Sequence, residues 1–219
     1  MRILVTSDFH GRSDAIEKTI LKARITYSNL IIICGDITHF GSIKDAYAML
    51  SDLSRQQIPV LFVPGNCDPS QLHYEKENTV FTIHGRCLNI KGINFLGVGG
   101  SPPTPFITPF ELAEEDIASI LVNASEECGN ARRLVLVSHS PPRNTRADLT
   151  LQGEHVGSES IREFIVRKKP CLVVCGHIHE GRGIDEIDGT IVVNPGAAKD
   201  GHVAVIDLNG NLNVELCQL

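Results

Sequence analysis

The chain has 219 residues, of which 42% are hydrophobic, and it carries a formal net charge of −6 at pH 7. This length and composition predict one domain over residues 1–219 with a full core, because no linker rich in Pro, Gly or Ser interrupts the sequence. The acidic balance offers no basic surface to a nucleic-acid backbone, which argues against a general DNA- or RNA-binding protein.

The start of the sequence and its cysteines indicate a compartment. The first predicted strand begins at Arg2, which leaves no room for a signal peptide, and no apolar run reaches the ~20 residues of a membrane span. Several of the seven cysteines lie inside apolar runs, among them Cys34, Cys171 and Cys175, as is typical of reduced, buried thiols. We therefore expect a soluble, cytoplasmic protein with no membrane partner.

The first half of the chain predicts strands that alternate with helices. The strands are runs of branched apolar residues at 3–5, 30–33 and 60–63. Each is followed by a helix-start signal, namely Ser13, the capping-box pair Ser42 and Asp45, and Asp68 before Pro69. The apolar face of the first helix is expected to contain Ile16, Ile20, Ala23 and Tyr27. This alternation predicts a parallel, doubly wound beginning.

The second half predicts antiparallel additions to this core. A hairpin is expected at residues 88–96 with its turn at 91–92, and two more are expected in the tail, with turns at 188–189 and 209–210. Further strands are expected at residues 134–137 and 172–174. Thr108 and Glu111 form a capping-box pattern before a helix that ends near residue 127, and Ser160 with Glu163 precedes another. Asn194-Pro195-Gly196 predicts a tight turn behind the strand ends.

Residues with metal-binding side chains follow five of the predicted strands. They are Asp8, His10, Asp36, Asn66, His139, His177 and His179. In open α/β sheets, the carboxyl ends of the strands form the ligand-binding edge. A set of oxygen and imidazole donors without a thiolate suits Mn, Fe, Co, Ni or Zn. Seven donors are too many for one ion, so we expect two divalent metal ions that share Asp36 as a bridge.

Each of these residues also has an ordinary structural explanation. A single Asp after a strand commonly caps a helix or stabilises a turn, and a single buried His commonly belongs to a hydrogen-bonded core. Here, however, such residues follow five predicted strands, and two pairs have a spacing of two that places both side chains on one side of an extended backbone. That coincidence favours one shared metal centre.

The order of these motifs resembles that of the calcineurin-like metallophosphoesterases over nearly the whole chain. The motifs are Asp8-x-His10, Gly35-Asp36, Gly65-Asn66-Cys67-Asp68, His139 and Gly176-His177-x-His179. The resemblance implies an α/β fold, a four-layer α-β-β-α sandwich of two mixed sheets. It also implies that the first metal is held by Asp8, His10, Asp36 and His179. The second would be held by Asp36, Asn66, His139 and His177.

The resemblance further implies a reaction, the hydrolysis of a phosphoester bond by attack of a metal-bound hydroxide. Asp36, Asn66 and His139 would then serve the chemistry as well as the binding of metal. Manganese is the first expectation for the metal, with Ni, Fe, Co or Zn as alternatives. No covalent phosphoenzyme is needed.

The chain departs from many members at Cys67, where they carry a His that protonates the leaving group or contacts the phosphate. A thiol is the poorer acid near neutral pH, because its unperturbed pKa is about 8.5 against about 6.5 for imidazole. Small bacterial and archaeal members with Gly-Asn-Cys-Asp share this departure. His39 and His155 are candidates for a replacement acid, and His155 also for a substrate contact. Asp68 is either a catalytic residue or a helix cap.

These observations favour a phosphodiesterase. A monoester carries more charge and usually has a poorer leaving group, so the missing His would matter more there. The alternatives are a phosphomonoesterase of broad specificity and a non-enzymatic metal-binding scaffold of the same fold. The expected partner is a small phosphoester or nucleotide, and the chain is a candidate homo-oligomer. Arg143 and Arg146 are either a clamp for a second phosphate or solvated loop charges.

Overall fold

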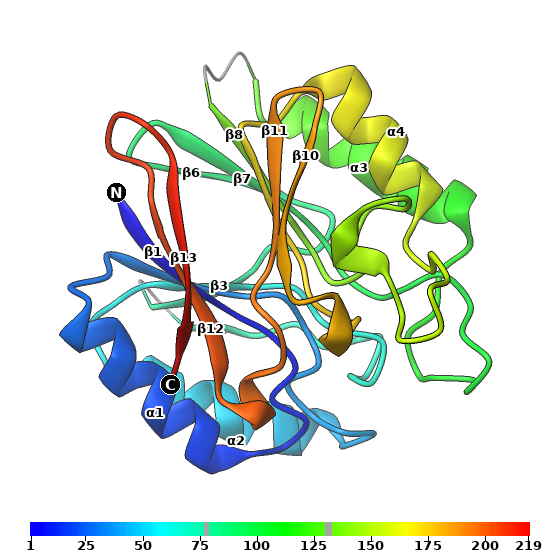
Figure 1. The fold of residues 1–219 in the computed structure, drawn as a ribbon. Helices are drawn as coiled ribbons and strands as arrows, with labels where there is room; N and C mark the ends of the chain where they lie inside the picture. The colour runs from blue at the N-terminus through cyan, green and yellow to red at the C-terminus, as the bar shows by residue number, and fades with distance from the viewer. Residues whose placement is uncertain (77–78, 130–132) are drawn as a thin grey trace.

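The computed structural model describes residues 1–76, 79–129 and 133–219. Two mixed β-sheets face each other, and two helices cover the outer face of each sheet (Figure 1). The chain therefore has the four-layer α-β-β-α architecture that the family resemblance implied, and the predicted fold class is confirmed. Within the described residues, no helix is both long and apolar enough to span a bilayer.

The first sheet has the strand order β13-β12-β1-β2-β3-β5-β4. Its strands are β1 (Arg2–Thr6), β2 (Leu30–Ile33), β3 (Val60–Phe62), β4 (Glu75–Lys76), β5 (Val80–Thr82), β12 (His202–Asp207) and β13 (Asn213–Gln218). Strands β1, β2, β3 and β5 run parallel, and the others are antiparallel additions. Helices α1 (Ser13–Ile25) and α2 (Ile43–Ser54) pack on its outer face (Figure 1).

The second sheet has the order β10-β11-β9-β8-β7-β6. Its strands are β6 (Cys87–Ile90), β7 (Ile93–Val98), β8 (Leu134–Ser138), β9 (Leu172–Val174), β10 (Gly183–Ile187) and β11 (Thr190–Asn194). Helices α3 (Glu114–Glu127) and α4 (Glu159–Lys168) cover it (Figure 1). The loops that the structure describes contain three short 3-10 helices: η1 (Arg146–Asp148), η2 (His179–Gly181) and η3 (Ala198–Asp200).

Central strands such as β2 and β9 are apolar throughout because both of their faces are buried. In β1, Ile3 and Val5 point toward the second sheet, whereas Leu4 between them points toward α1 and α2. In β8, Val135 points toward the first sheet and Leu136 toward α3 and α4. This alternation makes one core between the sheets and one under each pair of helices, so loops at the strand ends are held from both sides.

Helix α1 is shorter than its apolar pattern predicts. Tyr27 has φ 54° and its side chain is 82% exposed, so it does not belong to the buried face. The amide of Ser28 donates to the carbonyl of Ala23, and the amide of Tyr27 donates to that of Arg24. This pair of bonds around a left-handed residue is a Schellman motif, which ends the helix before the pattern does.

Four helix starts differ from the sequence prediction. Ser13 is the first residue of α1 and not its cap, because Arg12 takes the cap position, where no side chain makes a capping hydrogen bond. No helix lies between β3 and β4, where every residue is described, so Asp68 is not a helix cap. Glu111 does accept hydrogen bonds from the amide and hydroxyl of Thr108, but the polar cluster closes a loop and α3 begins later. The capping-box pattern at Ser160 is displaced, because Ser158 accepts the amide of Ile161 at the start of α4. The capping box of Ser42 and Asp45 and the three hairpins are confirmed.

Cysteine pairing also differs from the expectation of reduced thiols. Cys87 and Cys128 form a disulfide, with Cα atoms 5.3 Å apart. Packing of α3 against the β6–β7 hairpin brings together two residues that are 41 positions apart in the sequence. The other cysteines, including Cys34, Cys171 and Cys175, are free as expected.

Candidate metal centre

The seven predicted ligands lie at the carboxyl ends of five strands. Asp8 and His10 follow β1, Asp36 follows β2 and Asn66 follows β3, all in the first sheet. His139 follows β8, and His177 with His179 follows β9, in the second sheet. Because the sheets face each other, these loops meet at one edge of the sandwich, as the sequence predicts.

Four of the ligands adopt a backbone conformation that is rare outside glycine. Asp8, His10, Asp36 and His177 have φ values of 57°, 45°, 50° and 68°. Hydrogen bonds hold this geometry: the amide of Asp8 donates to the Gly35 carbonyl at 3.0 Å, and that of His10 to the Asp36 carbonyl at 2.9 Å. Strained backbone of this kind persists only where the surroundings impose it, and it concentrates at functional sites.

The first donor group consists of Asp8, His10 and His179, whose ligand atoms lie within 4.8 Å of one another. The Nε2 atoms of His10 and His179 face each other at 3.2 Å. Oδ1 of Asp8 lies 3.4 Å from Nε2 of His179 and 3.9 Å from Nε2 of His10. Oδ2 of Asp36 lies 3.7 Å from the same His10 nitrogen. These atoms converge on one point.

The second donor group is built around His139. Its Nδ1 lies 2.7 Å from the Cys34 carbonyl oxygen, to which it donates in the neutral ring. Its Nε2 then presents a lone pair to Oδ1 of Asn66 at 2.8 Å and to Oδ1 of Asp36 at 3.5 Å. Three electron pairs that face one another repel unless a cation lies between them. The ring of His177 packs edge-on against His139, with ring centroids 5.0 Å apart.

Burial changes the pKa values of three of these side chains, and each change bears on the binding of a cation. Burial lowers the pKa of His10 to about 4 and that of His177 to about 3, so both rings are neutral and can offer a lone pair at neutral pH. Burial raises the pKa of Asp36 to about 6. A nearby positive charge would reverse that last effect, because it favours the ionised carboxylate.

The residues fit a pair of divalent cations. Oδ1 of Asp8 is buried and has no hydrogen-bond partner among the described residues, which is a costly state for a carboxylate unless a cation compensates it. Three glycines also keep the space open, because a Cβ at Gly35 would collide with the His139 ring and one at Gly65 with the Asp36 carboxylate. A Cβ at Gly176 would collide with Ser7 and lie 2.7 Å from Oδ2 of Asp8.

The family model described as calcineurin-like phosphoesterase matches residues 1–181 of the chain. The chain belongs to this family. The uncharacterized protein MJ1162 of Methanocaldococcus jannaschii is 38% identical to it over 221 residues, which cover 96% of this chain and 98% of that protein. Family membership implies a binuclear centre of divalent metal ions, and the two donor groups are its candidate ligands.

Solved structures share the fold of this phosphoesterase at low sequence identity. TT1561 of Thermus thermophilus has a TM-score of 0.79 at 20% identity, covering 99% of this chain and 98% of that chain. A dimetal phosphatase from Danio rerio has a TM-score of 0.66 at 10% identity, covering 100% and 96%. A protein described as a novel archaeal phosphodiesterase has a TM-score of 0.58 at 16% identity, covering 99% and 100%.

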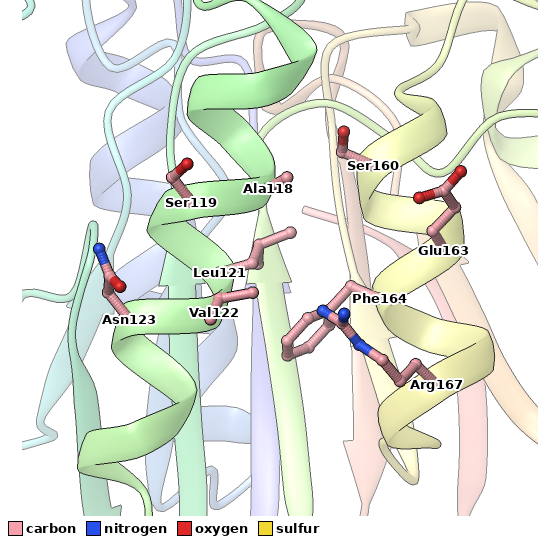
Figure 2. A pocket seen from close by; sticks show the side chains of 9 residues that line it. All are labelled: Ala118, Ser119, Leu121, Val122, Asn123, Ser160, Glu163, Phe164 and Arg167. Carbon is pink, nitrogen blue, oxygen red and sulfur yellow. The ribbon is translucent and has the colours of Figure 1, made fainter.

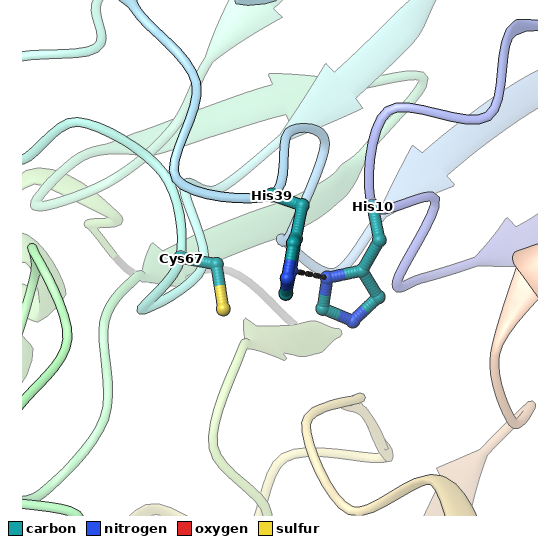
Figure 3. A group of neighbouring side chains, drawn as sticks. All are labelled: His10, His39 and Cys67. Atoms are coloured by element: carbon teal, nitrogen blue, oxygen red, sulfur yellow. Dashed lines mark hydrogen bonds between the residues drawn. The ribbon is translucent and has the colours of Figure 1, made fainter. Parts of the chain in front are cut away.

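The structure brings His39 and Cys67 to the edge of the first donor group (Figure 3). Nδ1 of His39 lies 3.3 Å from Nδ1 of His10, the nitrogen that faces away from His179. The Cys67 thiol lies in the same cluster, with ligand atoms within 4.8 Å. Burial, with the charge of Asp36, raises the pKa of Cys67 well above its usual range, so the thiol is protonated and a weak acid.

Asp68 lies directly behind the site and is fully buried. One of its oxygens accepts the amide and hydroxyl of Thr38 at 2.8 and 2.9 Å, and the other accepts the amides of Ile37 and Gly65 at 3.1 and 2.8 Å. These bonds join the loop after β2, which carries Asp36, to the loop after β3. The structure therefore gives Asp68 a positioning contact that neither sequence alternative described.

His155 is separate from these donor groups. Its Nδ1 lies 2.6 Å from Oδ1 of the buried Asp148. The two oxygens of this carboxylate also accept hydrogen bonds from the amides of Asn144, Thr145 and Gly157. The two arginines of this loop are engaged elsewhere: Nε of Arg143 pairs with Glu159 at 3.2 Å, and the Arg146 side chain lies against Gly183. The segment is thus tied together by Asp148.

The segment that follows β11 supports the site, and it contains Lys199, which the sequence did not single out. Nδ2 of Asn194 donates to the Ile178 carbonyl at 2.8 Å, and its Oδ1 accepts the amide of Gly196 at 2.9 Å, so the predicted turn holds the histidine loop. Lys199 follows this turn, and its amide donates to the carbonyl of Asp8 at 3.2 Å. Its position after an Asn-Pro-Gly turn was the only sequence signal.

A groove on the outer helical layer is distinct from the metal centre. It has a volume of about 350 Å³ and lies between α3 and α4, with Leu121 and Phe164 inside it and Glu163 and Arg167 beside them (Figure 2). None of the seven predicted ligands, all of which are described, lines this groove. The candidate ligands therefore lie at the edge of the sheets and not in this groove.

Proposed function

We propose that residues 1–219 form a single domain that hydrolyses phosphoesters with two divalent metal ions, and that its preferred substrates are phosphodiesters. One observation carries this proposal. The two oxygens of Asp36 face different donor groups, with Oδ2 toward His10 at 3.7 Å and Oδ1 toward His139 at 3.5 Å. A carboxylate in this position is suited to bridge two cations.

The first ion would be held by Asp8, His10, Asp36 and His179. The second would be held by Asp36, Asn66, His139 and His177. When bound, such a pair of ions polarises phosphate oxygens and lowers the pKa of water. For a set of oxygen and imidazole donors we expect Mn first, with Ni, Fe, Co or Zn as alternatives. The strained loops and glycines hold the donors in place before metal arrives, which limits reorganisation.

The preference for diesters rests on Cys67. Its thiol has a raised pKa because of burial, so it cannot readily protonate a poor leaving group. We assign the role of proton donor or phosphate contact to His39, because it lies against His10 at the exposed side of the site. We propose that His155 supports the loop through Asp148, since that carboxylate binds its Nδ1.

We also propose a cytoplasmic location. Three of the five free thiols, those of Cys34, Cys67 and Cys175, are buried, as suits a reducing compartment. The disulfide between Cys87 and Cys128 is the observation that weighs against it. The redox state of these two residues in protein isolated under thiol-trapping conditions tests this proposal.

The function is tested with metal-stripped protein that is reconstituted in turn with Mn, Ni, Co and Zn. Hydrolysis of bis-p-nitrophenyl phosphate is compared with that of p-nitrophenyl phosphate. His177→Ala should abolish turnover, whereas His73→Ala, which changes an exposed His paired with Glu75, should retain it. Higher turnover of the monoester would favour a phosphomonoesterase, and metal binding without turnover of either ester would favour the scaffold.

A further inference from the structure

Lys199 is fixed next to the first donor group by its backbone. It lies in η3, where the amide of Ala198 donates to the Ser7 carbonyl at 2.8 Å and that of Lys199 to the Asp8 carbonyl at 3.2 Å. Gly201, with φ 84°, ends the 3-10 turn in a conformation that favours glycine. The segment that carries Lys199 is therefore attached to the loop that carries Asp8 and His10.

Lys199 brings a positive charge to this part of the fold. The residue is half-buried, and its backbone contact with Asp8 places it beside the loop that carries Asp8 and His10.

Other cations around the site are already engaged, but Lys199 is not. Arg12 pairs with Asp14 at 2.8 Å, Arg143 pairs with Glu159 at 3.2 Å, and Nε of Arg182 donates to the Pro195 carbonyl at 3.2 Å. Within residues 1–76, 79–129 and 133–219, no carboxylate forms an ion pair with Lys199. Its ammonium group is therefore available to an incoming anion.

An unpaired ammonium beside a cation-binding centre has a cost, because it repels the metal ions. That cost is offset if an anion binds between the ammonium and the metals. We propose that Lys199 binds an anionic oxygen of the phosphoryl group of the substrate or product, on the His10 and His179 side of the centre. This inference rests on the proposed function. Its contribution should be larger for a dianionic phosphate than for a monoanionic diester.

The test measures binding rather than turnover. Affinities for Mn²⁺ and, separately, for inorganic phosphate on the Mn-loaded protein are determined by calorimetry for wild type, Lys199→Met and Lys199→Arg. Lys199→Met should weaken phosphate binding about tenfold, as expected for loss of a charge-assisted hydrogen bond. The same change should leave Mn²⁺ binding as tight or tighten it about two- to fivefold, because a repulsion is removed. Lys199→Arg should keep phosphate binding within about twofold of wild type.

Lys168→Met is the matched control, since it removes the same charge at the exposed end of α4 and should change neither affinity. If Lys199→Met does not fold, Lys199→Gln gives the same comparison. Unchanged phosphate affinity, or a parallel loss of Mn²⁺ and phosphate binding, would overturn the proposal. Hydrolysis of bis-p-nitrophenyl phosphate by the wild type is recorded separately, so failure of the proposed function remains distinct from failure at Lys199.

Discussion

Replacing Asp68 tests whether this carboxylate builds the site or takes part in the reaction. It receives four hydrogen bonds in a fully buried position, three of them from backbone amides. Asp68→Asn replaces one acceptor oxygen by a donor, so in either orientation of the amide at least one buried N–H loses its partner. Each such loss costs about 1–3 kcal/mol. Asp68→Ala leaves three amides unpaired, and we expect a cost of about 3 kcal/mol or more.

The assay is urea-induced unfolding of the metal-free protein, with the free energy of unfolding extrapolated to water. Asp14→Asn is the control, because that carboxylate is exposed and its removal should change stability little. Metal affinity should fall with stability in the Asp68 variants, since the loops that carry Asp36 and Asn66 lose their connection. If both variants kept the stability of the wild type but lost turnover, Asp68 would act in the chemistry and the positioning role would be refuted.

Two further predictions concern stability. Burial lowers the pKa of His10 to about 4 and that of His177 to about 3, so the folded protein excludes two protons that the unfolded chain binds below about pH 6.5. Burial raises the pKa of Asp36 to about 6, so this carboxylate binds one proton that the unfolded chain does not. The metal-free protein should therefore lose about 1 kcal/mol per pH unit between pH 6 and 4, and His177→Ala should reduce that slope in urea titrations; an equal slope in both proteins would contradict the assignment. Reduction of the disulfide between Cys87 and Cys128, which closes a separation of 41 residues, should lower the free energy of unfolding by about 2–4 kcal/mol, and equal denaturation midpoints with and without reductant would show that the bond does not stabilise the fold.

The strands and the donor set could be predicted because their signals are local. Runs such as Ile31–Ile33 are apolar at every position since both faces of the sheet are covered, and each donor stands close behind the end of its strand. Asp8 and His10, or His177 and His179, need only the direction of one strand to reach the same edge. The register that joins the two sheets is not needed for that conclusion.

The remaining features depend on contacts distant in sequence. Asp68 before Pro69 has the local pattern of a helix start, but the amides it serves belong to other loops as well as its own. Cys87 meets Cys128 only after α3 has packed on its sheet. Lys199 is an ordinary surface-type residue in the sequence, and η3 attaches it to the loop of Asp8.

The most direct test of the account is the number of Mn²⁺ ions bound per chain, measured together with hydrolysis of bis-p-nitrophenyl phosphate, for wild type and Asp36→Asn. This substitution preserves the size of the side chain but removes the charge that we place between the two ions. We predict two ions and metal-dependent hydrolysis in the wild type, and loss of at least one ion with a fall in turnover of about 100-fold or more in Asp36→Asn. A single ion in the active wild type, or full turnover in Asp36→Asn, would contradict it.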